Sequence, residues 1–366
     1  MDTPAIIIDK ERLIATFKHL HPLRDFGHVK LLLALKSCSF IPVLDLIRDY
    51  IDGSTTSSLF EVRLGHNTIG KETHAYSVGF KETEFTLIPK LSSKVIFNSL
   101  SQFDHYHSYC KDIPLGLRYN PQLSYSPYPL ANPCLENSRL GVKDLTEITQ
   151  RLDKISGLLI HFNCSNDYFE MFKLLTTKII RKLEPILNSL DWLSLGGGID
   201  FTSPNYPLLK LAQFLKELSD RYHLQIYLEP GETLFKTCAE LLTQVVDVIP
   251  GTPPIVIIDS SVEAHFLDQF IYKDPITIKN LLETDSSVSV QLAGSSCLAG
   301  DIFGTYSFSS LPSIGDTLTL DYPLGYSLLK QSWFNGLKKP AIWLRDKDSL
   351  SLLRNPTVQD YLESNR

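Results

Sequence analysis

Short apolar segments recur through the first two thirds of the chain, and each is followed by a longer amphipathic stretch. The segments lie at residues 30–35, 50–52, 74–78, 94–98, 115–119, 157–162, 192–196 and 225–229. Leucine and isoleucine recur at helical spacing in the stretches 171–190 and 208–222. Strands that alternate with helices indicate repeated βα units, and eight such units can close on themselves. The pattern therefore predicts a parallel (β/α)8 barrel.

The pattern changes after about residue 240. Apolar runs at 245–249, 255–259, 288–292 and 317–321 are separated by proline and glycine turns, with little helical periodicity. Such a pattern is typical of an antiparallel β domain. Because 366 residues exceed the usual size of one core, two domains are expected. We predict the barrel over 14–240 and a C-terminal β-barrel or sandwich over 241–366, joined by the N-terminal strand segment 1–13.

Composition limits the classes of function. The net charge is −6, which disfavours a nucleic-acid-binding protein. The apolar segments are all shorter than the roughly 20 residues of a membrane helix, and HExxH, P-loop and GxGxxG motifs are absent from the sequence. The six cysteines form no CxxC, and the chain starts without the features of a signal peptide. We expect reduced thiols, a cytoplasmic location, no metal site and no membrane partner.

Polar or flexible residues lie at the C-terminal ends of five of the predicted barrel strands: Lys36, Arg118, His161, Gly196-Gly197-Gly198 and Glu229. The chemistry of such barrels gathers at the C-terminal ends of the strands. Each feature also has a structural interpretation: Lys36 can mark the point where a strand meets water, and the glycines can form a tight turn. His161 can be a core residue, and Glu229 can begin a solvated turn. Their common position on one end of a barrel favours function.

These residue types match the requirements of pyridoxal 5′-phosphate (PLP). Lys36 supplies an amine that can form an imine, and His161 can stack on the ring. Glu229 can keep the pyridine nitrogen protonated, so that the ring accepts the electron pair left when a bond to Cα breaks. Gly196, Gly197 and Gly198 offer backbone amides to the phosphate. We therefore expect PLP as the cofactor.

Five blocks resemble, in order, the alanine-racemase-like (fold type III) PLP decarboxylases that act on ornithine and diaminopimelate. They lie at 34–37, 161–163, 196–198, 229–231 and 294–297, so the resemblance spans nearly the whole chain. Three further blocks, at 265–268, 297–301 and 333–336, look most like the carboxynorspermidine decarboxylase family. The resemblance implies a PLP-binding barrel followed by a β domain. It also implies a lyase of polyamine biosynthesis, which converts carboxynorspermidine to norspermidine, carboxyspermidine to spermidine, or both.

The resemblance assigns roles around the cofactor. It implies that Lys36 is the Schiff-base lysine, that His161 stacks on the ring and that Glu229 contacts the pyridine nitrogen. Tyr326 matches a tyrosine whose hydroxyl reaches the phosphate. Arg118 matches a strand-end arginine near the cofactor.

Cys297 matches the cysteine that enters the neighbouring subunit's site and protonates the carbanion after carbon dioxide leaves. The resemblance therefore implies a homodimer with active sites at the subunit interface. Without the resemblance, a small buried thiol would be the simpler interpretation of Cys297.

Two positions depart from the ornithine and diaminopimelate pattern. Glu232 replaces an arginine that binds the phosphate, and Leu298 replaces an acidic residue that holds the distal group of the substrate. A carboxylate cannot bind phosphate as arginine does, so backbone amides and Tyr326 must contribute more. The two amines in the tail of carboxynorspermidine need anionic partners, and we predict Glu232 and Asp268 for this task. The alternative for Asp268 is a solvated loop charge.

Other functions remain open on the sequence alone. One is a decarboxylase of the same fold that acts on diaminopimelate or another basic amino acid. Others are a racemase, a PLP carrier without catalysis and a purely structural barrel. Carboxynorspermidine and carboxyspermidine differ by one methylene, which a pocket distinguishes by only about 1–3 kcal/mol. The segment 120–137, rich in proline, tyrosine and serine, is predicted to be a long loop.

Overall fold

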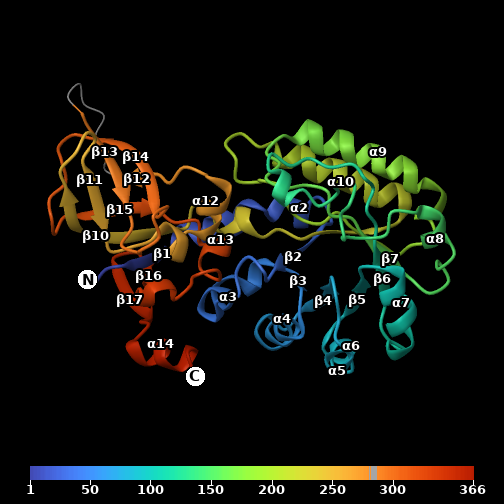
Figure 1. Ribbon diagram of the computed structural model, residues 1–366. Helices are drawn as coiled ribbons and strands as arrows, with labels where there is room; N and C mark the ends of the chain where they lie inside the picture. Colours follow the sequence, from blue (N-terminus) through green and yellow to red (C-terminus); the bar gives the residue numbers. More distant parts are fainter. Residues whose placement is uncertain (280, 282–286) are drawn as a thin grey trace. The chain divides into compact units, whose positions relative to one another are not determined.

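The computed structural model describes residues 1–279, 281 and 287–366, which divide into two compact units (Figure 1). One unit comprises residues 14–234, and the other combines residues 1–13 with residues 235–366. Within the described ranges, no helix is both long enough and apolar enough to cross a membrane.

The unit 14–234 contains a closed barrel of parallel strands, as the sequence predicts. Its strands are β2 (Lys30–Ala34), β3 (Gly53–Thr56), β4 (Glu72–Ser77), β5 (Lys94–Phe97), β6 (Leu115–Arg118), β7 (Gly157–Leu159), β8 (Trp192–Ser194) and β9 (Gln225–Leu228). The barrel closes where β9 pairs with β2, with Lys30 opposite Tyr227. One predicted strand was wrong: the segment 50–52 ends a short 3-10 helix, and the strand follows it at Gly53–Thr56. That strand is small and polar but fully buried, so it gives no apolar signal.

Helices connect the strands. They are α1 (Lys10–His19), α2 (His21–Asp25), α3 (Ile41–Ile47), α4 (Leu59–Leu64), α5 (Glu82–Phe85), α6 (Ile88–Leu91), α7 (Leu100–Tyr106), α8 (Leu145–Thr149), α9 (Phe169–Leu187) and α10 (Leu208–Tyr222). Turns of 3-10 helix are η1 (Arg48–Tyr50), η3 (His107–Tyr109), η4 (Pro129–Ala131) and η5 (Glu232–Phe235), and η2 (Gly65–Ile69) is a turn of π-helix. Helices α9 and α10 lie side by side (Figure 1) and bury the leucine and isoleucine faces that predicted them.

The interior of the barrel is filled by Leu32, Ile96, Leu159, Trp192 and Tyr227. Two glycines make room for the indole of Trp192. A Cβ atom on Gly157 would lie 2.1 Å from that ring, and one on Gly116 would lie 2.5 Å from it. The interior is therefore a packed core that separates the two ends of the barrel.

An ionic cluster lies where the barrel strands begin. Lys30, Glu72 and Lys94 are the first residues of their strands. Glu72 pairs with Lys30 and with Lys94, whose Nζ is 3.3 Å from its Oε2. The Tyr227 hydroxyl donates to Glu72 at 2.9 Å, and His74 Nε2 lies 3.3 Å from Glu72. Burial alone would raise the pKa of Glu72, but the hydrogen bonds from His74 and Lys30 and the charge of Lys94 hold it well below its usual value.

The second unit contains a sheet of nine strands among the described residues. They are β1 (Ala5–Asp9), β10 (Ala239–Ile249), β11 (Ile255–Ile258), β12 (Ile278–Lys279), β13 (Val288–Ala293), β14 (Ile302–Phe308), β15 (Thr317–Asp321), β16 (Ala341–Asp346) and β17 (Ser349–Arg354). The sheet is mostly antiparallel, but β1 runs parallel to β16 and β11 runs parallel to β13. The N-terminal strand β1 also pairs with β10. Shorter elements complete this unit: α11 (Val262–His265), α12 (Leu267–Tyr272), α13 (Leu324–Ser327), η6 (Phe334–Gly336) and α14 (Val358–Ser364).

Candidate active site

The predicted residues of the barrel unit lie together at the C-terminal ends of its strands, here called the rim. Arg118 is the last residue of β6, Lys36 and His161 each lie two residues beyond β2 and β7, and Glu229 directly follows β9. Gly231 packs on Ser37, beside Lys36: a Cβ atom on Gly231 would lie 3.0 Å from that of Ser37. Closure of the barrel thus brings these residues to one rim from four different strands.

Lys36 is exposed to solvent over part of its surface, whereas its amine is surrounded by protein groups. Desolvation lowers its pKa, and the positive charge of Arg118 lowers it further. The carboxylates of Glu229 and Glu61 act in the opposite direction. A lowered pKa increases the fraction of neutral amine, which is the nucleophilic form.

Glu229 is a buried carboxylate, with 9% of its surface exposed. The Ser194 hydroxyl donates to its Oε1 at 2.6 Å, and its backbone amide donates to the Gly196 carbonyl at 2.8 Å. Burial raises the pKa of Glu229, while hydrogen bonds from Ser194 and Thr55 and the charge of Lys36 lower it. A carboxylate in such a site stabilises a protonated ring nitrogen placed against it.

The glycine turn after β8 fixes the ring of His161. The Gly197 amide donates to His161 Nδ1 at 3.0 Å, so the neutral imidazole carries its proton on Nε2. Burial lowers the pKa of His161 well below its usual value, and the charges of Lys36 and Arg118 lower it further. Gly196 has a φ of +68°, and a Cβ atom there would lie 2.6 Å from His161 Nδ1. Glycine is required at this position.

Two of the three glycine amides predicted to meet a phosphate have acceptors within the protein. Gly197 donates to His161, and Gly196 donates to Ser194 Oγ at 3.2 Å. Gly198 has a φ of +82°, and a Cβ atom there would lie 2.1 Å from the Asn163 carbonyl oxygen. The turn therefore holds the rim together, and a phosphate contact stays a prediction that concerns Gly198 most directly.

Arg118 is held from the side by a tyrosine that was not among the predicted site residues. Arg118 is 6% exposed, and its guanidinium donates to the Tyr76 hydroxyl at 2.7 Å and lies 5.2 Å from the centre of that ring. The Tyr76 hydroxyl in turn donates to Asn98 Oδ1 at 2.8 Å. Tyr76 is the fifth residue of β4, and its position near the end of a strand was the available signal.

Two further titratable groups near Lys36 were not predicted. Glu61 lies in the first turn of α4, where its carboxylate accepts from the Ser57 amide at 2.6 Å. Burial raises the pKa of Glu61, and the charge of Lys36 opposes that rise. Cys164 follows His161 by three residues; burial raises its pKa, the charge of Glu232 raises it further and that of Lys36 lowers it. Glu232, exposed at the start of η5, is thereby placed on the same rim.

The predicted long loop 120–137 contacts this rim. The Tyr125 amide donates to the Phe162 carbonyl at 3.0 Å, and the Cys164 amide donates to the Tyr125 carbonyl at 2.9 Å. The loop also contains the short turn η4, so it is not wholly irregular. These two bonds fix the loop beside the segment that carries His161.

Cys297 belongs to the β unit and lies on a turn held from two sides. The thiol residue is exposed, and its amide donates to Asn335 Oδ1 at 2.6 Å. The buried carboxylate of Asp301 accepts from the Ser296 amide at 3.0 Å. A Cβ atom on Gly294 would lie 2.3 Å from Asp301 Oδ2. The sequence blocks 294–297 and 333–336 therefore meet to present Cys297.

Asp268 and Tyr326 lie in the same β unit and are joined by Lys330. Asp268 is 8% exposed and forms an ion pair with Lys330, so it is not a solvated loop charge. The Lys330 amine lies 5.0 Å from the centre of the Tyr326 ring. A substrate amine at Asp268 would have to share this carboxylate with Lys330, a partner that was not predicted from the sequence.

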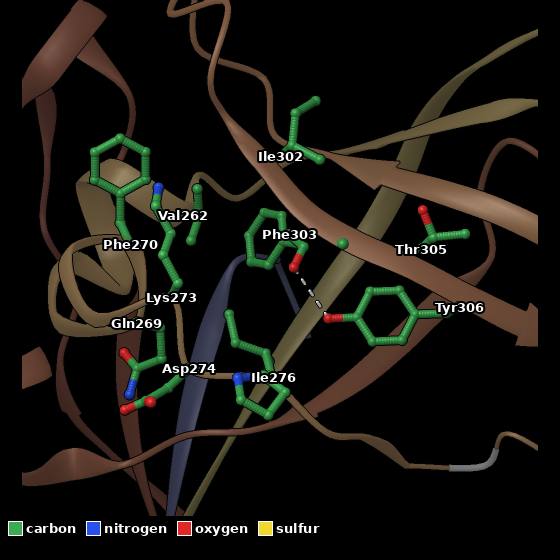
Figure 2. A pocket seen from close by; sticks show the side chains of 12 residues that line it. Val262, Gln269, Phe270, Lys273, Asp274, Ile276, Ile302, Phe303, Thr305 and Tyr306 are labelled. Carbon is green, nitrogen blue, oxygen red and sulfur yellow. Dashed lines mark hydrogen bonds between the residues drawn. The ribbon is translucent and has the colours of Figure 1, made fainter. Parts of the chain in front are cut away.

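Two cavities are lined by residues other than the predicted ones. In the β unit, a cavity of about 300 Å³ has the aromatic side chains of Phe270, Phe303 and Tyr306 on its walls (Figure 2). The Tyr306 hydroxyl donates to the Phe303 carbonyl at 3.3 Å, the dashed line in Figure 2. In the barrel unit, a cavity of about 550 Å³ adjoins Lys30 and Lys94, where the strands begin. Neither cavity contains a residue predicted to act on a substrate.

Comparison with known proteins identifies the family. No protein-family model matches the chain. Over 365 residues it is 40% identical to the carboxynorspermidine/carboxyspermidine decarboxylase of Herminiimonas arsenicoxydans, and the alignment covers 100% of the chain and 99% of that relative. It is 32% identical over 369 residues to the carboxyaminopropylagmatine decarboxylase of Synechocystis sp., covering 99% and 95%.

A solved structure agrees with these relatives. The chain superimposes with a TM-score of 0.91 on the crystal structure of carboxynorspermidine decarboxylase from Campylobacter jejuni, complexed with norspermidine. The sequence identity is 31%, and each chain is covered over 100% of its length. The fold and the full-length identity together show that the chain belongs to the carboxynorspermidine/carboxyspermidine decarboxylase family.

Proposed function

We propose that the protein is a PLP-dependent lyase that decarboxylates carboxynorspermidine to norspermidine, carboxyspermidine to spermidine, or both, in polyamine biosynthesis. The observation that carries this proposal is the arrangement of Lys36, His161 and Glu229 on one rim of a barrel that matches such decarboxylases over its full length. Carboxyaminopropylagmatine is a second candidate substrate, since a relative of that name is 32% identical.

The residues on the rim fit PLP. Lys36 offers an amine whose pKa is lowered by burial, so it would bind the cofactor covalently. Glu229, buried and fixed by Ser194, would hold a proton on the ring nitrogen. His161, held by the Gly197 amide, would contact the ring. When bound, PLP accepts the electron pair left at Cα as the carboxylate departs.

The proton that replaces the carboxylate needs a donor. We assign this step to the thiol of Cys297, which is exposed on its turn and fixed through its amide to Asn335. The resemblance of the block 294–297 supports delivery of this thiol to the site of a second subunit, so the proposal includes a homodimer. It also includes a cytoplasmic location, because the described cysteines are all free thiols.

The substrate carries two cationic amines beyond its α-carbon. Glu232 supports the recognition of one amine, because it is an exposed carboxylate on the rim that carries Lys36. A charge-assisted hydrogen bond from the substrate amine would be stronger than a neutral one. Asp268 is the proposed partner of the other amine, in exchange with Lys330. Neutral replacements at these two positions should weaken substrate binding more than PLP binding.

The test is Lys36→Ala. We expect loss of the cofactor absorbance band and of carbon dioxide release, whereas Lys216→Ala, on the exposed face of α10, should leave both unchanged. Steady-state kinetics with carboxynorspermidine, carboxyspermidine and carboxyaminopropylagmatine should rank the substrates, with diaminopimelate as the comparison. Decarboxylation by Lys36→Ala, or faster turnover of diaminopimelate than of the other three, would contradict the proposal.

A further inference from the structure

We propose that Asp200 is a positioning residue, which holds Glu232 on the rim by bonding to the hydroxyl of Thr233. This inference rests on the proposed function, because Glu232 is the carboxylate assigned there to a substrate amine. Asp200 follows the glycine turn after β8, whereas Thr233 lies in η5, after β9. The bond therefore links two neighbouring strand ends.

The carboxylate of Asp200 holds the hydroxyls of Thr202 and Thr233, and we call this arrangement the clamp. Asp200 Oδ1 accepts hydrogen bonds from Thr233 Oγ1 at 2.8 Å and from Thr202 Oγ1 at 2.9 Å. The two hydroxyls lie 3.2 Å apart. Asp200 and Thr233 are each 8% exposed, so little water competes for these bonds. Hydrogen bonds to a buried carboxylate are among the stronger ones in a protein.

Asp200 is itself fixed from a third loop. Its amide donates to the Asn166 carbonyl at 2.9 Å, and the Asn166 amide donates to the Gly198 carbonyl at 2.8 Å. Asn166 is fully buried, and its side chain donates to Asn163 Oδ1 at 2.8 Å. The carboxylate of Asp200 thus stands on a scaffold made by the segments after β7 and β8.

Glu232 depends on this scaffold because of its place in the chain. Its side chain is exposed, whereas the side chain that follows it, Thr233, is buried and points to Asp200. Fixing Thr233 limits the backbone freedom of its neighbour, so the carboxylate of Glu232 is held in a smaller set of positions. Such preorganisation strengthens the binding of a ligand without adding a contact to it.

The decisive variant is Thr233→Val, which removes the donor and keeps the shape of the side chain; Thr233→Ser restores the hydroxyl. The measurements are the KM and kcat for carboxynorspermidine and the Kd for norspermidine on the holoenzyme. We expect Thr233→Val to raise KM and Kd about tenfold, a loss of about 1.4 kcal/mol, with kcat within about twofold of the parent. Cofactor absorbance should not change. Thr233→Ser should bind as the parent does.

A double-mutant cycle separates positioning from general stability. If Thr233 acts through Glu232, adding Thr233→Val to Glu232→Gln should change Kd by less than about twofold. A full tenfold effect in that background would overturn the proposal, as would a change confined to the melting temperature. If Thr233→Val does not fold, Asp200→Asn weakens the same bond from the acceptor side, and the same outcomes apply.

The failure of this inference is distinguishable from failure of the proposed function. If Glu232→Gln binds norspermidine as tightly as the parent, the assignment of Glu232 is wrong. If Glu232→Gln is impaired and Thr233→Val is not, the clamp is wrong. Amide hydrogen exchange across η5 gives a readout without substrate: Thr233→Val should speed it at least tenfold, and unchanged exchange would refute the positioning role.

Discussion

Gly196→Ala should displace His161 and loosen the cofactor site. A side chain at φ +68° costs about 1–2 kcal/mol, because the left-handed conformation crowds the Cβ atom. The new methyl group would lie 2.6 Å from His161 Nδ1 and 2.9 Å from its Cα, so the backbone as well as the ring must shift. Overpacking of this kind costs about 1–3 kcal/mol. Rotation of the imidazole would relieve the contact but remove the acceptor of the Gly197 amide.

The expected loss is therefore about 3 kcal/mol, or a fall of roughly 6–12 °C in melting temperature for a unit of this size. Displacement of His161 should also weaken PLP binding about tenfold, measured by titrating the apoenzyme and following cofactor absorbance. Gly79→Ala is the matched control: it is exposed, and a Cβ atom there meets nothing within 4 Å. If Gly196→Ala melts within about 1 °C of the control and binds PLP equally well, the steric argument is wrong.

Two predictions concern the ionic cluster where the barrel strands begin. Glu72→Gln should destabilise the barrel by about 2–3 kcal/mol at pH 7, since Lys94, whose side chain is 13% exposed, loses its partly buried anionic partner. Because the folded-state pKa of Glu72 lies below its unfolded value, this difference in stability between Glu72→Gln and the parent should hold above about pH 5 and shrink below about pH 4. The control is Asp220→Asn, in an exposed ion pair with Lys216, which should lower the stability by less than about 0.5 kcal/mol. Burial lowers the pKa of His74 to about 4, so the parent should lose up to about 3 kcal/mol as pH falls from about 6.5 to that value. His74→Phe should lack this loss in urea unfolding, and an unchanged pH profile would exclude His74 as its source.

The parts of the fold that the sequence predicted were those with strong periodicity. Helices α9 and α10 bury regular leucine and isoleucine faces, so their spacing was sufficient. Strand β3 was misplaced because its residues Gly53–Thr56 are small and polar, although the barrel buries them all. Strand β17 was missed although serine and leucine alternate along it, and the structure leaves most of its residues exposed, Leu350 and Leu352 included.

The residues of the candidate site also fall into those that could be predicted from the sequence and those that could not. The positions of Lys36, Arg118 and Glu229 could be predicted, because each residue lies at or just after the end of one barrel strand. The partners of these groups were not, since they lie far away in the sequence. Tyr76 bonds to Arg118 across 42 positions, and Lys330 pairs with Asp268 across 62. Only the folded chain brings such pairs together.

The indole of Trp192, which lies against Gly116 and Gly157, can also serve as an optical probe. Of the three tryptophans, Trp192 is the one within residues 14–234, because the other two lie at positions 333 and 343. It is 2% exposed, so its emission should report the packing of the barrel interior. A protein with Trp192 as its only tryptophan would therefore carry two optical signals, indole emission from the core and cofactor absorbance from the rim. Recorded together during refolding, they would show whether the barrel closes before the rim can capture PLP.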